Sequence, residues 1–300
     1  MRGKTPPGRL SFLGAAVIIL ALHSPCGAAR RPPFSFSAST AHLFPADLDG
    51  GGTMSASRLM LSLGGKWPLN QALIVGAGLS YDVENYNFDG PSSLWDAAPW
   101  DTVHRTSFSL ALTLRTRSRW ICSFSPSLEL AVEKGADWDR GLSFGGTLSA
   151  MKLIRPGLLL GIGAGVFDRV DKRVVFPYLV VDWQISERFR ISNPFRAGPA
   201  GPAGLEAVYR GGSGWEAAIG GAYRSFRFRL DNDGAVPGGI GENRFIPLFL
   251  RLTGFCSPKW QIDLYGGTFL EGKLKVENSS ADAVDEDQYK PSLFFALTLS

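Results

Sequence analysis

Apolar and polar residues alternate with a period of two from about Ser57 to the end of the chain. In one run, every second residue from Phe108 to Leu114 is large and apolar, and serine, alanine or threonine stands between them. The run from Trp120 to Glu133 repeats this pattern. Because successive side chains of a strand point to opposite faces, this period predicts β-strands with one apolar face and one small or polar face.

About fourteen such strands are expected. The first, ninth and tenth have the weakest pattern, so twelve strands is the alternative count. The expected spans are 34–44, 53–65, 71–83, 104–117, 119–133, 140–153, 157–168, 174–186, 187–194, 203–211, 214–229, 244–256, 258–272 and 289–299.

The connections between these strands alternate between short and long. Short ones are expected at Gly65–Asn70, Arg117–Arg119, Ile154–Gly157, Ser186–Arg188, Gly211–Gly214 and Cys256–Lys259. Longer ones are expected at Pro45–Gly52, Glu84–Val103, Lys134–Asp139, Asp168–Arg173, Pro194–Pro202, Asp231–Asn243 and Val276–Gln288. Outer-membrane barrels have short turns at one end and long loops at the other, whereas a soluble β-sandwich, the alternative fold, has no reason to sort its loops in this way. The sequence therefore predicts an all-β, antiparallel transmembrane β-barrel.

The tryptophans follow the same division. Five lie within a few residues of a short connection: Trp67, Trp120, Trp183, Trp215 and Trp260. The other three lie in the expected long loops: Trp95, Trp100 and Trp138. An indole favours the membrane interface, where its ring is in an apolar environment and its N–H reaches water. The first five are therefore expected to form an aromatic girdle at the short-turn end.

Charged residues occupy the small or polar face of the strands. An Arg or Lys on the lipid face near the membrane midplane costs roughly 2–4 kcal/mol, so the alternation assigns these charges to the lumen. They either pair with one another and fill a narrow barrel, or line a wet channel and set its ion preference. The expected lumen-lining residues are Arg58, Arg115, Glu129, Asp182, Glu206, Glu216, Arg224, Arg227, Arg229, Arg251, Asp263 and Glu271.

Two features depart from a regular ladder. The apolar residues of the eleventh strand are at odd positions up to Ile219 and at even positions from Phe226, so a β-bulge near Tyr223–Ser225 is expected to restore the outward facing of the second set. Three prolines, Pro126, Pro177 and Pro247, fall inside strands, where the missing N–H weakens a central ladder. Bulges or local fraying are expected at these prolines.

The N-terminus has the features of a secretory signal peptide. Basic residues precede an apolar segment, Leu10–Leu22, and small residues at Ala28 and Ala29 offer a cleavage site. Residues 1–29 are therefore expected to be removed, leaving residues 30–300 as a single barrel domain. A lipoprotein anchor at Cys26 is the weaker alternative because a proline directly precedes it.

Composition excludes several classes of function. The chain has 31 basic and 27 acidic residues, and removal of residues 1–29 leaves 28 and 27, so the charge gives no reason to expect nucleic-acid binding. Cys122 and Cys256 are expected to be unpaired. No cofactor or metal motif is present, and the acidic loop segments Asp231–Gly234 and Asp282–Asp287 are expected to be solvated. His104, near Thr106 and Ser107, is the only candidate for catalysis, and we do not expect an enzyme.

The mature chain resembles the outer-membrane β-barrel families of Gram-negative bacteria, and within them the uncharacterised barrel domains of similar size. The resemblance rests on the signal peptide, the alternating strands, the tryptophans at the turns and the terminal strand, where Leu293, Phe295, Leu297 and Leu299 share one face. The chain departs from the family at its last residues, since it ends in Leu299–Ser300 rather than in phenylalanine. The resemblance implies location in the outer membrane and, as partners, lipid, lipopolysaccharide and the barrel-assembly machinery. It does not indicate the oligomeric state.

Three functions follow from this sequence. A passive pore or channel for small solutes or ions predicts conductance and a change of ion selectivity in charge reversals such as Arg251→Glu. A closed structural or adhesive barrel predicts no conductance and a role for the outer loops, chiefly Glu84–Val103. A membrane-embedded lipid hydrolase, the third hypothesis, predicts turnover that is lost in His104→Ala.

Overall fold

The computed structural model describes residues 34–300 except 91–98, 194–202, 213 and 258. The expected signal peptide, Trp95 and the expected loop Pro194–Pro202 lie outside the described residues. The strands of the described part are β1 (Phe34–Asp47), β2 (Thr53–Pro68), β3 (Leu73–Asp89), β4 (Thr102–Arg115), β5 (Trp120–Glu133), β6 (Leu142–Arg155), β7 (Leu158–Arg169), β8 (Lys172–Gln184), β9 (Phe189–Ser192), β10 (Gly204–Arg210), β11 (Trp215–Ala222), β12 (Arg224–Arg229), β13 (Ile240–Ser257), β14 (Trp260–Glu277), β15 (Ala283–Tyr289) and β16 (Ser292–Leu299). One short 3-10 helix, η1 (Trp138–Gly141), precedes β6.

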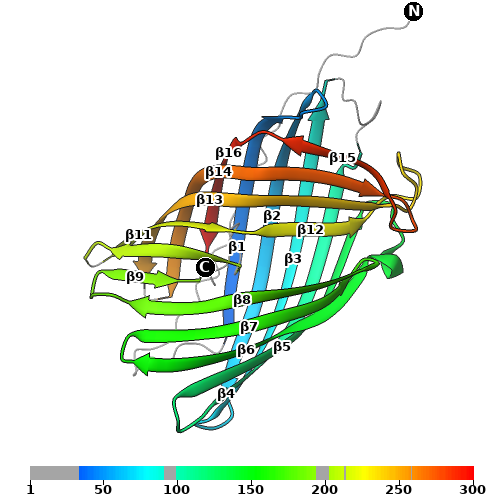
Figure 1. The fold of residues 1–300 in the computed structure, drawn as a ribbon. Helices are drawn as coiled ribbons and strands as arrows, with labels where there is room; N and C mark the ends of the chain where they lie inside the picture. The colour runs from blue at the N-terminus through cyan, green and yellow to red at the C-terminus, as the bar shows by residue number, and fades with distance from the viewer. Residues whose placement is uncertain (1–33, 91–98, 194–202, 213, 258) are drawn as a thin grey trace, which may run out of the picture. The chain divides into compact units, whose positions relative to one another are not determined.

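These strands form one sheet that closes on itself (Figure 1). Strands β1 to β11 pair antiparallel in sequence order, and the ring is completed through β13, β14 and β16 back to β1. Strand β12 continues the line of β11 along β13, and β15 continues the line of β16 along β14. Each of these pairs counts as one strand of the ring, so the expected barrel of fourteen strands is confirmed. No helix among the described residues is both long and apolar enough to cross a membrane.

The two ends of the barrel differ, as expected. Six short connections lie at one end, which we call the short-turn end. They join β2 to β3, β4 to β5, β6 to β7, β8 to β9, β10 to β11 and β13 to β14. The opposite end is the long-loop end. Two expected loops are wrong. Val276–Gln288 contains strand β15, which pairs with β14. Asp168–Arg173 is a two-residue turn at Val170 and Asp171, both with positive φ. The strands β7 and β8 continue to this tip because it packs against β12, whose Arg227 Nε donates to the Val170 carbonyl at 2.9 Å.

The outer face of the barrel is an apolar band. Outward leucine, isoleucine and phenylalanine side chains are exposed on strand after strand, with Leu148 and Ile162 at 61% and 68%. An exposed apolar surface of this extent is unfavourable in water, and it matches the lipid-facing band of a transmembrane barrel. The five tryptophans expected to form a girdle all lie near the short-turn end and are at least partly exposed: Trp67, Trp120, Trp183, Trp215 and Trp260.

The bulge expected near Tyr223 is wrong. The pairs Gly221–Leu248 and Arg224–Phe245 belong to one continuous register, so the alternation does not shift between β11 and β12. Phe226 consequently faces inward, where it is 7% exposed, instead of facing lipid. The sequence pattern misled here because the apolar residues of β12 pack inside the barrel.

The three prolines occupy positions where no ladder hydrogen bond is required. At Pro126 the pairing of β4 and β5 is interrupted between Ser109–Ser127 and Leu112–Phe124. Pro247 lies on β13, at the point where its pairing with β11 ends and its pairing with β12 has not yet begun. These two interruptions agree with the local fraying that the sequence predicts.

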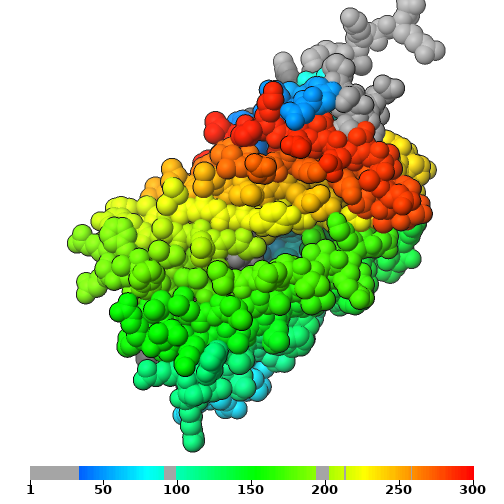
Figure 2. Space-filling model, in the orientation of Figure 1, coloured from blue at the N-terminus to red at the C-terminus, as the bar shows by residue number. Residues whose placement is uncertain are grey.

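Pro177 lies on an open edge of β8. Strand β9 pairs with β8 only from Asp182 to Gln184, and Asn193 extends this contact by accepting from the Val181 N–H at 2.8 Å and donating to the Leu179 carbonyl at 3.1 Å. Backbone groups two residues apart point to the same side of a strand, so Pro177 directs its nitrogen to the same edge. Beyond Asn193 this edge has no strand partner among the described residues, and Figure 2 shows the surface hollowed between β8 and β12.

Strand β12 runs toward the interior instead of continuing along β8. Its last residue, Arg229, forms a parallel bridge with Val132 at the end of β5. Arg169 of β7 donates to the carbonyl of Ser225 at 3.0 Å. Both faces of β12 are therefore covered, and its arginines and phenylalanines are buried together.

Candidate functional site

The interior of the barrel contains a vestibule, a cavity of about 360 Å³ that lies nearer the short-turn end. One wall is formed by β5 and β6, where Ser123 is opposite Ser149 and Ser125 is opposite Thr147. The Ser123 hydroxyl bonds to Thr113 at 2.7 Å. The other three hydroxyl groups have no hydrogen-bond partner among the described residues, so they are free to bond to water or to a solute.

Glycines widen this part of the interior. A Cβ atom at Gly163 would come within 2.3 Å of the Tyr178 ring, and one at Gly165 within 2.5 Å of the Phe176 ring. The two rings therefore lie flat across β7 only because glycine stands beneath them. The glycine-rich run of β7 therefore serves packing inside a strand.

The opposite wall of the vestibule carries ion pairs. Arg190 donates to both carboxylate oxygens of Asp182, at 2.7 and 2.8 Å, and Arg210 donates to Glu216 at 3.2 Å. Asp182 and Arg190 are 40% and 38% exposed, so water reaches this pair inside the barrel. Their charges compensate each other, and the wall presents both signs to a solute.

Arg251 is the centre of a buried network beside the vestibule. Its guanidinium lies 3.0 Å from Glu206, 3.6 Å from Asp263 and 4.0 Å from Glu216, and its side chain is 1% exposed. Thr253 accepts from Arg251 and donates to Asp263. The expectation that Arg251→Glu changes ion selectivity stays a prediction. In this geometry the reversal would place a fourth carboxylate among three buried ones.

Above the vestibule lies a group of four arginines, the arginine layer: Arg58, Arg105, Arg169 and Arg224. Arg58 ion-pairs with Asp82, and Arg105 ion-pairs with Glu84. The side chains of Arg58 and Arg105 are only 10% and 4% exposed. The sequence left two arrangements open: charges that pair with one another, or charges that line a wet channel. Arg58 and Arg105 follow the first.

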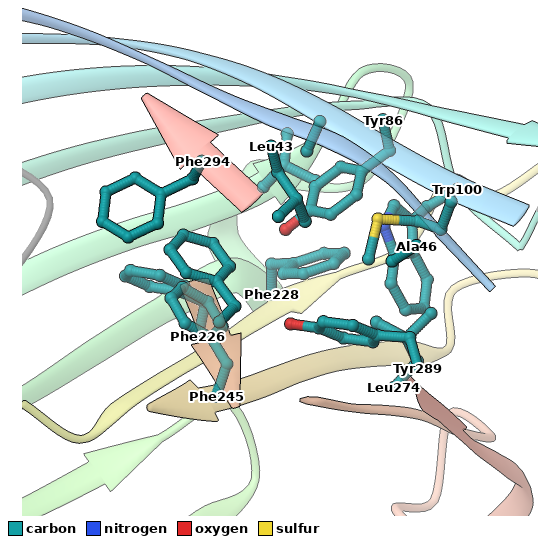
Figure 3. Packing of buried hydrophobic residues seen from close by; sticks show 14 of the residues in the cluster. Leu43, Ala46, Tyr86, Trp100, Phe226, Phe228, Phe245, Leu274, Tyr289 and Phe294 are labelled. Atoms are coloured by element: carbon teal, nitrogen blue, oxygen red, sulfur yellow. The ribbon is translucent and has the colours of Figure 1, made fainter. Parts of the chain in front are cut away.

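The long-loop half of the interior is filled by an aromatic plug: Tyr86, Trp100, Phe226, Phe228, Phe245, Phe249, Tyr265, Phe269, Tyr289 and Phe294 (Figure 3). Ring centroids are 5.2 Å apart for Trp100 and Phe228, and 4.1 Å apart for Phe245 and Phe269. The hydroxyl groups of Tyr86 and Tyr289 bond to the side-chain amide of Asn243. The plug closes the long-loop end of the lumen with well-packed apolar surface. Asn243 satisfies the two tyrosine hydroxyl groups, whereas the buried Nε1 of Trp100 has no hydrogen-bond partner among the described residues.

Trp100 enters the plug from the connection between β3 and β4, and sequence reasoning had placed it in an outer loop. It is 2% exposed and packs against Tyr86, Phe88 and Phe228. Glu133 holds this segment in place, since its two carboxylate oxygens accept from the backbone N–H groups of Asp101 and Asp231, at 2.8 and 2.9 Å. A tryptophan at the end of a long connection was the only sequence signal for this contact.

Three other residues expected to line the lumen lie outside the ion pairs described above: Arg115, Glu129 and Glu271. Arg115 is exposed near the short-turn end, and Glu129 is partly buried on β5. Glu271 does not join the inner set. It is an exposed residue with φ of 52°, at a point where the register of β13 and β14 shifts by one residue. A bulge thus occurs in β14, whereas the one expected in the eleventh strand is absent.

Among the described residues, only Tyr81 hydrogen-bonds to the His104 ring, and it does not make a nucleophile–base pair of the kind that the hydrolase hypothesis requires. The His104 ring nitrogen bonds to the Tyr81 hydroxyl at 2.8 Å, and neither Thr106 nor Ser107 contacts it. His42 bonds to Ser57 at 2.9 Å, but no described residue hydrogen-bonds to the other nitrogen of its ring. The described residues contain no group of His, Cys, Asp and Glu able to hold a metal ion, and Cys122 and Cys256 are free thiols.

No family model matches the sequence, and no curated protein matches it. Among solved structures, the chain is similar to an outer membrane channel from Pseudomonas putida F1, with 12% identity, a TM-score of 0.47, and coverage of 92% of this chain and 99% of that one. It is similar to the Pseudomonas putida toluene transporter TodX, with 11% identity, a TM-score of 0.41, and coverage of 90% and 89%. It is also similar to the KdgM porin in complex with disordered oligogalacturonate, with 10% identity, a TM-score of 0.34, and coverage of 88% and 98%. The strand pairing of this chain itself defines a fourteen-stranded antiparallel barrel with an apolar outer band.

Proposed function

We propose that this protein is a passive channel for small polar solutes in the bacterial outer membrane, closed at its long-loop end in the conformation described here. The observation that carries the proposal is the vestibule, whose hydroxyl groups and half-exposed ion pairs lie inside a barrel with an apolar exterior. A barrel that serves only as a scaffold has no need of a solvated interior. A wet lumen lined by both signs of charge suits solutes that cross with their hydration partly replaced by the wall.

The aromatic plug defines where the channel must open. The plug residues come from β3, β12, β13, β14, β15, β16 and the connection that carries Trp100, so the closed end depends on one packed cluster. Trp100 is the member contributed by a connection rather than by a strand of the ring. Removal of the Trp100 side chain therefore takes a ring out of the lumen without breaking a strand pair.

The plug also favours a second candidate, the closed structural or adhesive barrel that acts through its outer loops. Buried aromatic pairs contribute about 0.5–1.5 kcal/mol each beyond the area that they bury. A plug of ten aromatic residues therefore resists opening unless the loop segments move. The two candidates differ in whether removal of one plug residue produces conductance.

Single-channel conductance in planar bilayers tests the proposal. Three refolded proteins are compared: the mature chain, Trp100→Ala and the matched control Trp138→Ala, whose side chain is 72% exposed on η1. Heat-dependent gel mobility first confirms that each is folded. We expect small or infrequent steps for the mature chain and the control, and larger or more frequent steps for Trp100→Ala.

If folded Trp100→Ala and the mature chain both fail to conduct, the channel proposal is wrong and the closed barrel becomes the better account. If Trp138→Ala raises conductance as much as Trp100→Ala does, the effect does not come from the plug. The location is tested separately, by fractionation of cells that express the protein. Recovery in the soluble fraction would contradict an outer-membrane channel.

A further inference from the structure

Three arginine side chains converge on one aromatic ring inside the barrel. The guanidinium carbons of Arg105, Arg58 and Arg224 lie over the Phe226 ring, at 3.9, 4.4 and 4.7 Å from its centroid. A ring has two faces, so at least two of these cations share a face. A single cation over a ring is favourable, but cations that crowd one face repel each other, and the repulsion is larger where water is scarce.

The carboxylates beside the cluster compensate only part of this charge. Asp82 pairs with Arg58 and lies 3.9 Å from Arg105, and Glu84 pairs with Arg105. These are two carboxylates for two of the four arginines in the arginine layer.

The other two arginines have no such partner. Neither Arg169 nor Arg224 forms an ion pair with a residue that the structure describes, and Arg169 donates to Ser225 instead. Glu129 lies within electrostatic range of both without contacting either. Glu242 also lies within range of Arg169, but it is paired with Arg227 and Arg244. The four arginines of the layer therefore share three carboxylates that pair with no described arginine outside it: Asp82, Glu84 and Glu129.

Several guanidinium donors in this layer are buried without an acceptor. They are Nε of Arg58, Nε and Nη1 of Arg105, and Nε of Arg224. Arg105 as a residue is 3% exposed. A buried donor without a partner is unfavourable and rare in native proteins. An acceptor that also carries negative charge would satisfy the donors and the excess cation together.

We propose that the arginine layer binds a small oxyanion, such as a phosphate group or the carboxylate of an organic acid. Guanidinium groups present a planar fork of N–H donors that matches the oxygens of these anions. On β5, Glu129, which lies within electrostatic range of the layer, shares one face with Ser125 of the vestibule. The two residues are four positions apart, which is about 13 Å along a strand. Three of the arginines contact Phe226 of the aromatic plug, so we expect an anion to approach the layer from the vestibule side.

This site goes beyond the proposed channel activity, because binding to the folded barrel is measurable whether or not the barrel conducts. Isothermal titration calorimetry of the full mature chain, folded in detergent, uses inorganic phosphate and succinate as separate probes at constant ionic strength. We expect one site per barrel for at least one probe. Phosphate alone, succinate alone or both would distinguish phosphate recognition, carboxylate recognition and general oxyanion binding.

Two variants with opposite expected effects locate the site. Arg224→Gln removes the unpaired guanidinium and is expected to weaken binding at least tenfold, which corresponds to about 1.4 kcal/mol. Glu129→Gln removes a repelling carboxylate and is expected to tighten binding severalfold. The control Arg173→Gln changes an arginine that is 75% exposed outside the layer, and it should bind as the parent does.

The proposal is overturned if the parent protein binds neither probe, or if Arg224→Gln binds with unchanged affinity. Gel mobility is checked for each variant. If Arg224→Gln does not fold, the proposed site is tested by Glu129→Gln alone. Weaker or unchanged anion binding in that variant contradicts the proposed site. Binding that Arg173→Gln abolishes would place the anion elsewhere on the protein.

Discussion

Replacement of Arg251 by methionine tests whether the inner charges hold the barrel together. The side chain is 1% exposed, and its guanidinium is within 4.0 Å of three carboxylates, those of Glu206, Glu216 and Asp263. Methionine keeps most of the side-chain length and removes the charge. The variant therefore removes the cation that these three buried carboxylates share, and of the three Glu216 keeps its contact with Arg210.

The magnitude follows from the cost of an uncompensated buried charge. Removal of one partner of a buried ion pair costs about 3–5 kcal/mol. With a urea dependence of about 3 kcal/mol per molar, this loss lowers the unfolding midpoint by roughly 1–1.7 M. Arg251→Glu should cost more, because it adds a carboxylate, and we expect that variant to fail in assembly instead of changing ion selectivity.

The assay is urea unfolding of the protein folded in lipid vesicles, followed by tryptophan fluorescence and gel mobility. Arg173→Met is the control, since Arg173 is 75% exposed and its nearest carboxylate oxygen is 3.9 Å away, and a change within about 0.5 kcal/mol is expected. If Arg251→Met unfolds within 0.3 M urea of the parent, the network is not a stabilising centre and the reasoning fails.

Three further outcomes follow from the structure. Asn193→Ala removes the side chain that bonds to the open edge of β8 and to β10, and it should destabilise this corner by about 1–3 kcal/mol, seen as faster hydrogen exchange of the β8 amide that it caps; unchanged exchange would mean that another group holds the edge. Asp182→Asn leaves Arg190 uncompensated in the vestibule, so the reversal potential in a salt gradient should shift toward anion preference, with less than about 1 kcal/mol lost in stability because the pair is half-exposed. Strand β14 has 18 residues, whereas a membrane strand needs about 9–11, so Lys273 lies beyond the bilayer, where its hydrogen bond holds the pKa of Glu286 below its usual range. The contribution of this pair is present at neutral pH and lost as the pH falls through that lowered pKa, and an NMR titration of Lys273→Gln should show the pKa of Glu286 rising; an unchanged titration would contradict the assignment.

Local properties of the chain were enough to predict the barrel. The alternation of apolar and small residues identified nearly every strand because lipid outside and small residues inside impose a period of two on each strand separately. The prolines illustrate this point: Pro126 and Pro247 lie at interruptions of the ladder and Pro177 at an open edge, as the missing N–H requires. Turn lengths and the tryptophans beside them are also local features.

The sequence pattern could not distinguish a packed interior from a wet one. Both have polar or aromatic residues at the same alternate positions, and the difference depends on which side chains meet across the ring. Phe226 contacts arginines of β2 and β4 that are more than a hundred residues away, and Trp100 packs against Phe228 in the same way. Alternation gave the wrong facing for Phe226 for this reason.

The sequence by itself determined that this chain forms a closed, antiparallel, lipid-facing barrel with distinct ends. Only the tertiary structure decided what fills it: a vestibule lined by hydroxyl groups and ion pairs, arginines with and without ion-pair partners beside it, and an aromatic plug beyond. The physical reason is range. Strand formation and facing depend on neighbours in sequence, whereas the contents of the lumen depend on closure of the ring, which brings β2, β4, β12 and the connection after β3 to one point.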